Sequence, residues 1–175
     1  SGTKVEVLDT RTGFQRFTWT APSEVVSIGW EEPTGARLFV GAGGHVSVFD
    51  LVSKDPVFDL AIGDRGFRFD GNHWLFALDS NGNAGAAELS ESGERLHFTS
   101  SDDPVVAGSS DWWFDHDFVL LHASGKLERV NARAGANVWT KTLDPMPLAF
   151  VHSTTTRGYA WFADHVEELD LSGAE

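Results

Sequence analysis

The sequence predicts an all-β protein built from short antiparallel strands, on three observations. Its 175 residues include 13 Phe, 7 Trp and 18 Gly but only 1 Met and 1 Tyr, a composition that favours aromatic-rich strands and glycine-containing turns over helices. Runs of alternating apolar and polar residues are bounded by Gly, Pro, Asp and Ser. One strand pattern also recurs at a nearly constant spacing, which is typical of a repeat architecture.

The clearest unit runs from Val25 to Leu60 and has four expected strands. They are VVSIGW, ARLFV, HVSVFDL and PVFDL, and the turns between them are EEPTG, GAGG and VSKD. No helix is expected after GAGG, so this segment is interpreted as a hairpin and not as a phosphate-binding loop. Four antiparallel strands in about 40 residues correspond to one blade of a β-propeller.

Each repeat is marked by the last residue of a strand that precedes a polar turn. The markers are Asp9, Asp50, Ser90, Asn131 and Asp170, which are 41, 40, 41 and 39 residues apart. A turn and an apolar strand follow every marker except the last. Matching turn positions that need a positive φ are expected at Gly13, Gly93, Gly135 and Gly173, with Asp55 in the remaining repeat.

The strands before these markers also recur. FRFDGNHWLFALDSNGN and WWFDHDFVLLHASG both contain an aromatic strand, ending at Phe69-Asp70 or Phe114-Asp115, and then a buried strand, Trp74–Leu78 or Phe118–His122. Residues 148–163 follow the same plan. The buried strands are apolar on both faces, which suits strands between neighbouring blades. The first strand of each blade is expected to line a central channel.

This register predicts a single domain over residues 1–175, with blades at 21–62, 63–101, 102–144 and 145–175, and with residues 4–20 supplying strands of an adjoining blade. The last blade then has three strands, and two strands stand at the N-terminus. Either the N-terminus supplies the missing outer strand, or the chain is part of a larger ring completed by a second copy, another chain or further sequence. An unclosed ring exposes sheet edges, which are association sites.

The charge balance narrows the expected partners. With 13 basic and 26 acidic residues the net charge is −13, which repels nucleic acid and anionic lipid and favours a basic protein partner. No apolar run is long enough for a membrane span, and no secretory signal opens the sequence. Cysteine is absent, which excludes disulfides and thiolate metal sites. We expect a soluble protein without a cofactor, with the cytoplasm as the favoured compartment.

Two parts of the chain resemble known repeats. Val25–Leu60 resembles a WD-repeat blade, with VVSIGW as its first strand and Phe49-Asp50 where the Trp-Asp pair stands. LDTRTGFQRFTW and VNARAGANVWTKTL are similar to quinoprotein-type propeller repeats. The resemblance implies a propeller with a general binding role. No Gly-His pair starts the blades, and the cofactor-binding residues of quinone dehydrogenases have no counterparts, so the resemblance implies neither the WD hydrogen-bond tetrad nor redox chemistry.

Asp79, Asn81 and Asn83 have the alternate spacing of a calcium-binding loop. The twelfth position of that loop is Ser90, where a bidentate Glu would be needed. Asn-Gly between two strands is also a strong hairpin signal. A hairpin turn without a metal is therefore the preferred interpretation.

Residues 111–117 (DWWFDHD) gather three carboxylates and an imidazole, which are zinc-ligand types. One tight turn rarely brings such groups to a single ion, so an aromatic strand followed by a polar turn is favoured. Exposed side chains at Trp112 or Trp113 would suit a carbohydrate or a peptide, because flat aromatic faces flanked by acids bind such ligands. A glycan-binding or glycan-active propeller is therefore one alternative function.

The links between blades share one face with the turns between second and third strands. Asp64, Asp102, Asp103 and Asp144 would form an acidic rim on that face, and Thr99–Ser110 is expected to be the longest link. Long loops on a rigid scaffold often carry recognition. The leading hypothesis is a non-enzymatic protein-binding module or scaffold, immunity-like or antitoxin-like, whose acidic rim or open edge binds a basic protein.

Overall fold

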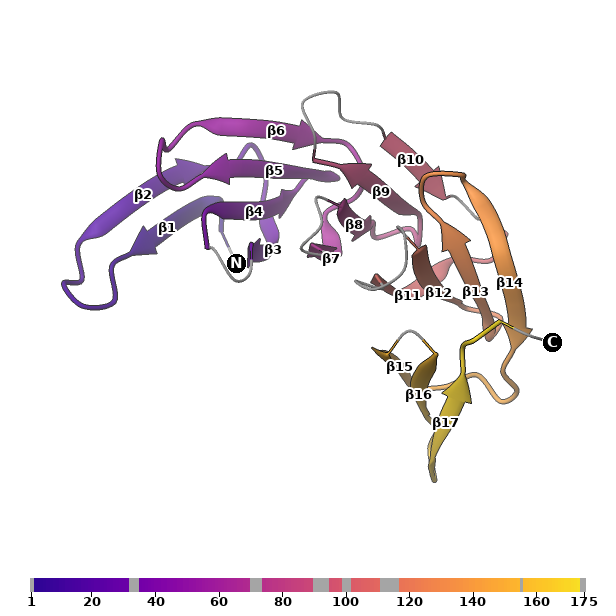
Figure 1. Ribbon diagram of the computed structural model, residues 1–175. Helices are drawn as coiled ribbons and strands as arrows, with labels where there is room; N and C mark the ends of the chain where they lie inside the picture. Colours follow the sequence, from indigo (N-terminus) through magenta and orange to yellow (C-terminus); the bar gives the residue numbers. More distant parts are fainter. Residues whose placement is uncertain are drawn as a thin grey trace.

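The computed structural model describes residues 2–31, 35–69, 74–89, 95–98, 102–110, 117–154 and 156–173. Every regular element in these ranges is a β-strand, and no helix that could cross a membrane is found in them. The strands pair in antiparallel fashion and form five sheets, which follow one another along an open arc (Figure 1).

Three of the sheets have four strands each. The first contains β3 (Val25–Trp30), β4 (Arg37–Ala42), β5 (His45–Asp50) and β6 (Pro56–Leu60). The second contains β7 (Arg65–Phe69), β8 (Trp74–Leu78), β9 (Ala84–Glu88) and β10 (Arg95–Phe98). The third contains β11 (Val105–Ser110), β12 (Asp117–His122), β13 (Lys126–Asn131) and β14 (Ala136–Thr142). The C-terminal sheet has β15 (Ala149–Thr154), β16 (Arg157–Trp161) and β17 (Val166–Asp170), and the N-terminal sheet has β1 (Lys4–Leu8) and β2 (Gln15–Thr20).

The sheets are arranged like the spokes of a wheel. Their first strands, β3, β7, β11 and β15, contact one another in turn on the concave side of the arc (Figure 1). Within each sheet the strands follow in sequence order toward the convex side. This is the arrangement of blades in a β-propeller. The predicted fold class, an all-β propeller or partial propeller of four-stranded antiparallel blades, is confirmed.

The core lies between neighbouring sheets. Between the second and third sheets the rings of Phe76 and Phe118 stack with their centroids 5.1 Å apart, and Trp74 and Leu120 join the same buried cluster. Each of the other interfaces contains an equivalent cluster. β12 is buried along its whole length, as its apolar sequence predicts.

An aspartate at the end of a third strand holds the turn that follows it. Oδ1 of Asp9, Asp50 and Asp170 accepts the backbone N–H two residues later, at 2.9, 2.7 and 2.9 Å. Such turns are a common use of the short Asp side chain. Backbone N–H donors are the main cause that holds the pKa of all three carboxyls below the ordinary value.

The positive φ expected in these turns is found at Gly13, Gly135 and Gly173, with φ values of 71°, 61° and 79°. Gly93 lies outside the described residues. In the first four-stranded sheet the positive φ, 71°, is at Lys54, so the prediction of Asp55 was wrong by one residue. The position is fixed by the turn hydrogen bond, since the carbonyl of Asp50 accepts the N–H of Lys54 at 2.8 Å.

The first strand of the third four-stranded sheet is also not where the sequence predicts it. β11 covers Val105–Ser110, a segment expected to be a loop, while the aromatic residues 112–114 lie outside the described residues. A Cβ at Gly108 would lie 2.4 Å from the Phe76 ring, so glycine is needed there for the second sheet to pack against β11. The described part of the link before β11 is therefore only residues 102–104, and the expectation of one long recognition loop was wrong.

The N-terminal strands do not close the ring within this chain. Among the described residues, β17 pairs only with β16, and β1 pairs only with β2. The N-terminal and C-terminal sheets lie at opposite ends of the arc (Figure 1). The alternative in which residues 4–20 supply the outer strand of the C-terminal sheet is therefore wrong.

Candidate functional site

The links between sheets and the turns between second and third strands meet on one face, as predicted. Asp64 Oδ2 accepts the N–H of Gly44 at 2.8 Å. Asp103 accepts the N–H and the hydroxyl of Ser124 at 2.9 and 2.7 Å. Both aspartates belong to links between sheets. Their partners, Gly44 and Ser124, belong to turns between the second and third strands of a sheet. Two members of the predicted acidic rim therefore use their carboxylates to fasten loops.

The other two members are free to face solvent. Asp102 and Asp144 are both exposed, and Asp144 precedes a cis proline. The carboxylate of Asp103 is more constrained. Its burial opposes ionisation, but the hydrogen bonds from Ser124 outweigh that effect, so the pKa of Asp103 lies below its ordinary value.

We expect Asp103→Asn to lower the free energy of unfolding at pH 7 by about 1 kcal/mol, because the charged acceptor of two hydrogen bonds is lost. The depressed pKa means that the carboxylate stabilises the fold above about pH 4, and that this contribution disappears as the pH falls through the folded-state pKa. The difference between wild type and variant should therefore shrink at pH 3. Urea unfolding at both pH values measures it, with exposed Asp102→Asn as the control, and a constant difference would contradict the assignment.

A buried histidine lies directly beneath Asp103. The side chain of His122 is 1% exposed, and its Nδ1 is 2.7 Å from the Asp103 carbonyl oxygen. Its Nε2 is 3.0 Å from Glu128 Oε1. This group connects the link to the middle of the third sheet, so it supports the loop face. The sequence gives no signal for it, because its three members come from two strands and a loop.

The Asp79 carboxylate accepts hydrogen bonds from residues of its own turn. It accepts the N–H groups of Asn81 and Asn83, both at 2.8 Å, and the Asn83 side-chain amide at 2.7 Å. The turn joins β8 and β9, so the hairpin interpretation is confirmed. No group of three or more metal-ligating side chains occurs in the described part of the chain.

The acidic and aromatic segment 111–117 is described only at its last residue. Trp112 and Trp113 lie outside the described residues. Asp117 is buried, and it accepts hydrogen bonds from Arg129 Nε and Asn131 Nδ2, both at 2.6 Å. This carboxylate therefore belongs to a buried ion pair of the third sheet and not to a surface site.

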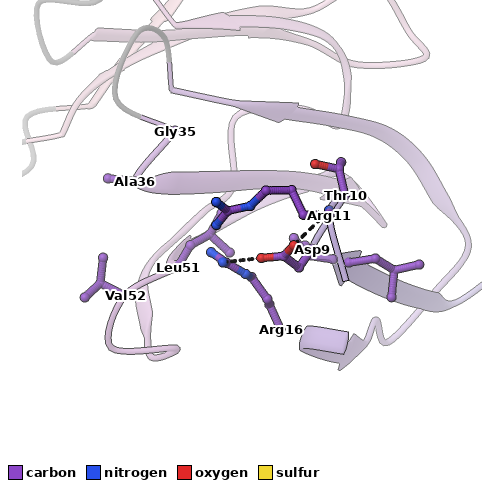
Figure 2. Close-up of a pocket in the computed structure, with 10 residues that line it drawn as sticks. Asp9, Thr10, Arg11, Arg16, Gly35, Ala36, Leu51 and Val52 are labelled. Atoms are coloured by element: carbon purple, nitrogen blue, oxygen red, sulfur yellow. Dashed lines mark hydrogen bonds and ion pairs between the residues drawn. The ribbon is translucent and has the colours of Figure 1, made fainter. Parts of the chain in front are cut away.

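A pocket of about 450 Å³ lies between the β1–β2 turn and the first sheet, on the face opposite the acidic rim. Figure 2 shows the side chains of Arg11 and Arg16 beside Asp9 and Leu51. Arg16 Nη2 forms an ion pair with Asp9 Oδ2. Two guanidinium groups around one carboxylate leave this pocket with a positive balance, in contrast to the whole chain.

The N-terminal end of the arc exposes an apolar sheet face. β1 and β2 pack on the outer part of the first sheet, where Leu38, Val40 and Phe49 are buried with Val5 and Phe17. The same face of β3 is not covered, and Ile28 and Trp30 are 53% and 62% exposed. Trp30 is paired in register with Leu38, which is 2% exposed. The N-terminal sheet therefore covers β4 but leaves the adjacent strand β3 exposed on this face.

The C-terminal end exposes a second apolar face. Phe150 and Ala160 are paired neighbours on the side of the C-terminal sheet that packs on the third sheet, and both are buried. Val151, Trp161 and Val166 are 47%, 38% and 52% exposed. Trp161 pairs in register with Val166, and both lie on the side away from the third sheet. Each end of the arc thus presents large apolar side chains to solvent.

No protein-family model and no curated protein matches this sequence. Solved β-propeller structures do match. The Cps50 (Swd1) β-propeller domain of Myceliophteria thermophila aligns at a TM-score of 0.72 and 13% identity, covering 94% of this chain and 57% of that chain. Hsv2 of Kluyveromyces marxianus aligns at 0.77 and 12%, covering 99% and 55%. The dihydro-heme d1 dehydrogenase NirN in complex with DHE aligns at 0.74 and 17%, covering 98% and 40%.

These comparisons define the class of the protein by its fold. It is a β-propeller protein whose chain spans about half the length, or less, of the propeller structures it matches. At such low identities the likeness shows the fold and not the repeat family. The fold alone assigns no role, and one of the matched structures is a dehydrogenase.

Proposed function

We propose that this chain is a non-enzymatic protein-binding module whose two end faces bind the polypeptide that continues its ring. The observation that carries the proposal is the exposure of Trp30, 62%, beside fully covered Leu38 on the same sheet face. Exposed aromatic patches of this kind mark interaction sites. The coverage of only 40–57% of the matched propeller chains supports the same function.

The opposite face of β3 is covered by a neighbouring sheet. There the neighbouring sheet lies so close that a Cβ at Gly29 would be 3.0 Å from the Phe67 ring. An inner strand of a propeller is thus covered by the next sheet, and the Ile28 and Trp30 face has no such cover among the described residues. Burying each of these side chains would contribute about 1.5–3 kcal/mol to binding before the costs of association.

We expect a photo-reactive phenylalanine analogue at position 30 or 161 to form covalent adducts with a polypeptide in cells that produce the chain. The reason is that both positions lie on the end faces. The same analogue at Val138, which is 51% exposed on the convex strand β14, is the matched control. Mass spectrometry of the adducts measures the outcome. Equal adducts at all three positions, or none at positions 30 and 161, would contradict the proposal.

A second candidate uses the acidic face to bind a basic protein, as an immunity protein or antitoxin would. It is favoured by the exposure of Asp102 and Asp144 on one face of a chain whose net charge is −13. Charge complementarity of this kind chiefly raises the association rate and the specificity.

This second candidate predicts that a lysine-rich peptide binds about tenfold more weakly when the salt concentration rises from 50 to 200 mM, because the charges are screened. The double variant Asp102→Asn/Asp144→Asn should bind more weakly and with a smaller salt dependence. Titration calorimetry measures both, with Asp59→Asn, an exposed change outside the rim, as the control. Binding that does not respond to salt would exclude this face.

The glycan alternative depends on Trp112 and Trp113, which lie outside the described residues, and it stays a prediction. A glycan-array screen of the wild type and of Trp113→Ala tests it. Binding of a glycan that is lost in this variant would support the alternative, and the absence of any binding would remove it.

A further inference from the structure

The two end sheets of the arc contain different strands of a blade. β1 and β2 occupy the positions of a third and a fourth strand, and among the described residues no strand pairs on the inner side of β1 (Figure 1). β15, β16 and β17 occupy the first three positions, and among the described residues no strand pairs on the outer side of β17. The C-terminal sheet of one copy therefore contains a first and a second strand that fit on the inner side of β1 of another copy.

β1 and β17 are equivalent strands in sequence. Residues 4–9 read KVEVLD and residues 165–170 read HVEELD, which are identical at four of six positions. Both end in an aspartate that accepts the N–H two residues later, at 2.9 Å. A strand of this sequence can therefore pair with β16, as β17 does, and with β2, as β1 does.

The burial of equivalent side chains in these two strands is reciprocal. Val5 faces the first four-stranded sheet and is 3% exposed, whereas its counterpart Val166 is 52% exposed. On the opposite side, Leu169 packs in the cluster against the third sheet and is 0% exposed, whereas its counterpart Leu8 is 54% exposed. If one strand had the first four-stranded sheet on one side, as β1 has, and the third four-stranded sheet on the other, as β17 has, both of its faces would be buried.

We propose that the partner at the end faces is a second copy of this chain, a proposal that rests on the proposed function. In this dimer β1 of one copy pairs with β16 of the other copy and takes the place of β17. The sheet β15-β16-β1-β2 then lies between the third sheet of one copy and the first sheet of the next. On the face of this sheet away from the third sheet, Trp161 of one copy then lies toward Trp30 and Ile28 of the other copy. β17 is released, because β1 and β17 need the same position.

Two such junctions would close a ring of about eight sheets, which is at the upper end of the range for propellers. The two copies carry the same charge of −13, so their association is opposed by repulsion. Added salt should therefore strengthen this association, the opposite of the response expected for a basic partner.

Engineered disulfides test the junction directly, because the chain contains no cysteine. Tyr159 pairs in register with Glu168, whose counterpart in β1 is Val7. The variant Val7→Cys/Tyr159→Cys should form a covalent dimer or ring on oxidation at 0.5 M salt. Glu6→Cys/Tyr159→Cys is the matched control, because successive side chains of a strand point to opposite faces. No cross-link in the first variant, or equal cross-linking in both, would overturn the proposal.

A deletion provides a second test that does not depend on cross-linking. Removal of residues 164–175 takes away the competitor of β1, so the fraction of dimer in light scattering should rise severalfold over wild type at equal concentration. Removal of residues 1–20 in addition should return the shortened chain to its own monomer mass, which is below the 19.1 kDa of the full chain. A monomer after the first deletion, with circular dichroism showing an intact fold, would overturn the proposal.

The adducts formed at position 30 separate the two proposals. Adducts that contain only peptides of this chain support the second copy. Adducts that contain peptides of another polypeptide overturn the second copy and leave the protein-binding function standing. The absence of adducts contradicts the protein-binding function itself.

Discussion

Replacement of Phe118 by alanine is expected to lower the free energy of unfolding by about 3–5 kcal/mol. The Phe118 ring is 1% exposed and stacks on Phe76 of the preceding sheet at 5.1 Å. It also contacts Trp74 edge-on at 6.5 Å, so alanine would leave a cavity at the centre of this interface. Because each sheet is held mainly by its neighbours, we expect the second and third sheets to lose their packing together.

Urea unfolding followed by tryptophan fluorescence measures this loss. The control is Val138→Ala on the exposed convex strand, which should change the free energy of unfolding by less than about 0.5 kcal/mol. An effect of Phe118→Ala below about 1 kcal/mol would mean that the sheets are not packed on one another as described.

The sequence predicts well those strands whose two faces are both specified by packing. β8 and β12 lie between two sheets, so their apolar runs, WLFAL and FVLL, stand out in the sequence. The outer strand Pro56–Leu60 is observed with the bounds expected from its alternation and its turns. Local turn chemistry and burial point to the same elements here, which is why the propeller could be inferred.

The inner strands are harder to predict because a long-range contact selects their residues. β11 has the sequence VVAGSS, and its glycine is required by the Phe76 ring, which is 32 residues away in the chain. Small and polar residues of this kind resemble a loop when read locally. The prediction therefore placed the strand on the more hydrophobic aromatic residues that follow.

The candidate site was predictable in position but not in chemistry. Chain order alone brings Asp64 and Asp103 to the loop face. Whether a carboxylate faces a partner or its own fold depends on turns that are distant in sequence, at Gly44 and Ser124. The strand count from the sequence was correct at both ends, since the C-terminal sheet has three strands and the N-terminal sheet has two among the described residues.

Replacement of Arg129 by methionine is expected to cost about 3–5 kcal/mol, because it removes one partner of a buried ion pair. Arg129 and Asp117 have side chains that are only 11% and 9% exposed, and Nε lies 2.6 Å from Oδ2. The methionine side chain keeps most of the apolar packing, so the cost reflects mainly the carboxylate that stays buried in the third sheet. The exposed pair Arg157–Glu168 is the control, and Arg157→Met should change stability by less than about 1 kcal/mol.

The double variant Asp117→Asn/Arg129→Met separates the ion pair from packing. Asparagine at position 117 removes the charge and still offers one oxygen to the Asn131 amide, which now donates to Asp117 Oδ1 at 2.6 Å. We therefore expect the double variant to regain at least about 2 kcal/mol over Arg129→Met alone, since buried pairs are often replaceable when both charges are removed. If the two single losses simply add, the pair is not coupled and Arg129 stabilises β13 through other contacts. A regain would show that the charge of Asp117 is held in the fold by Arg129.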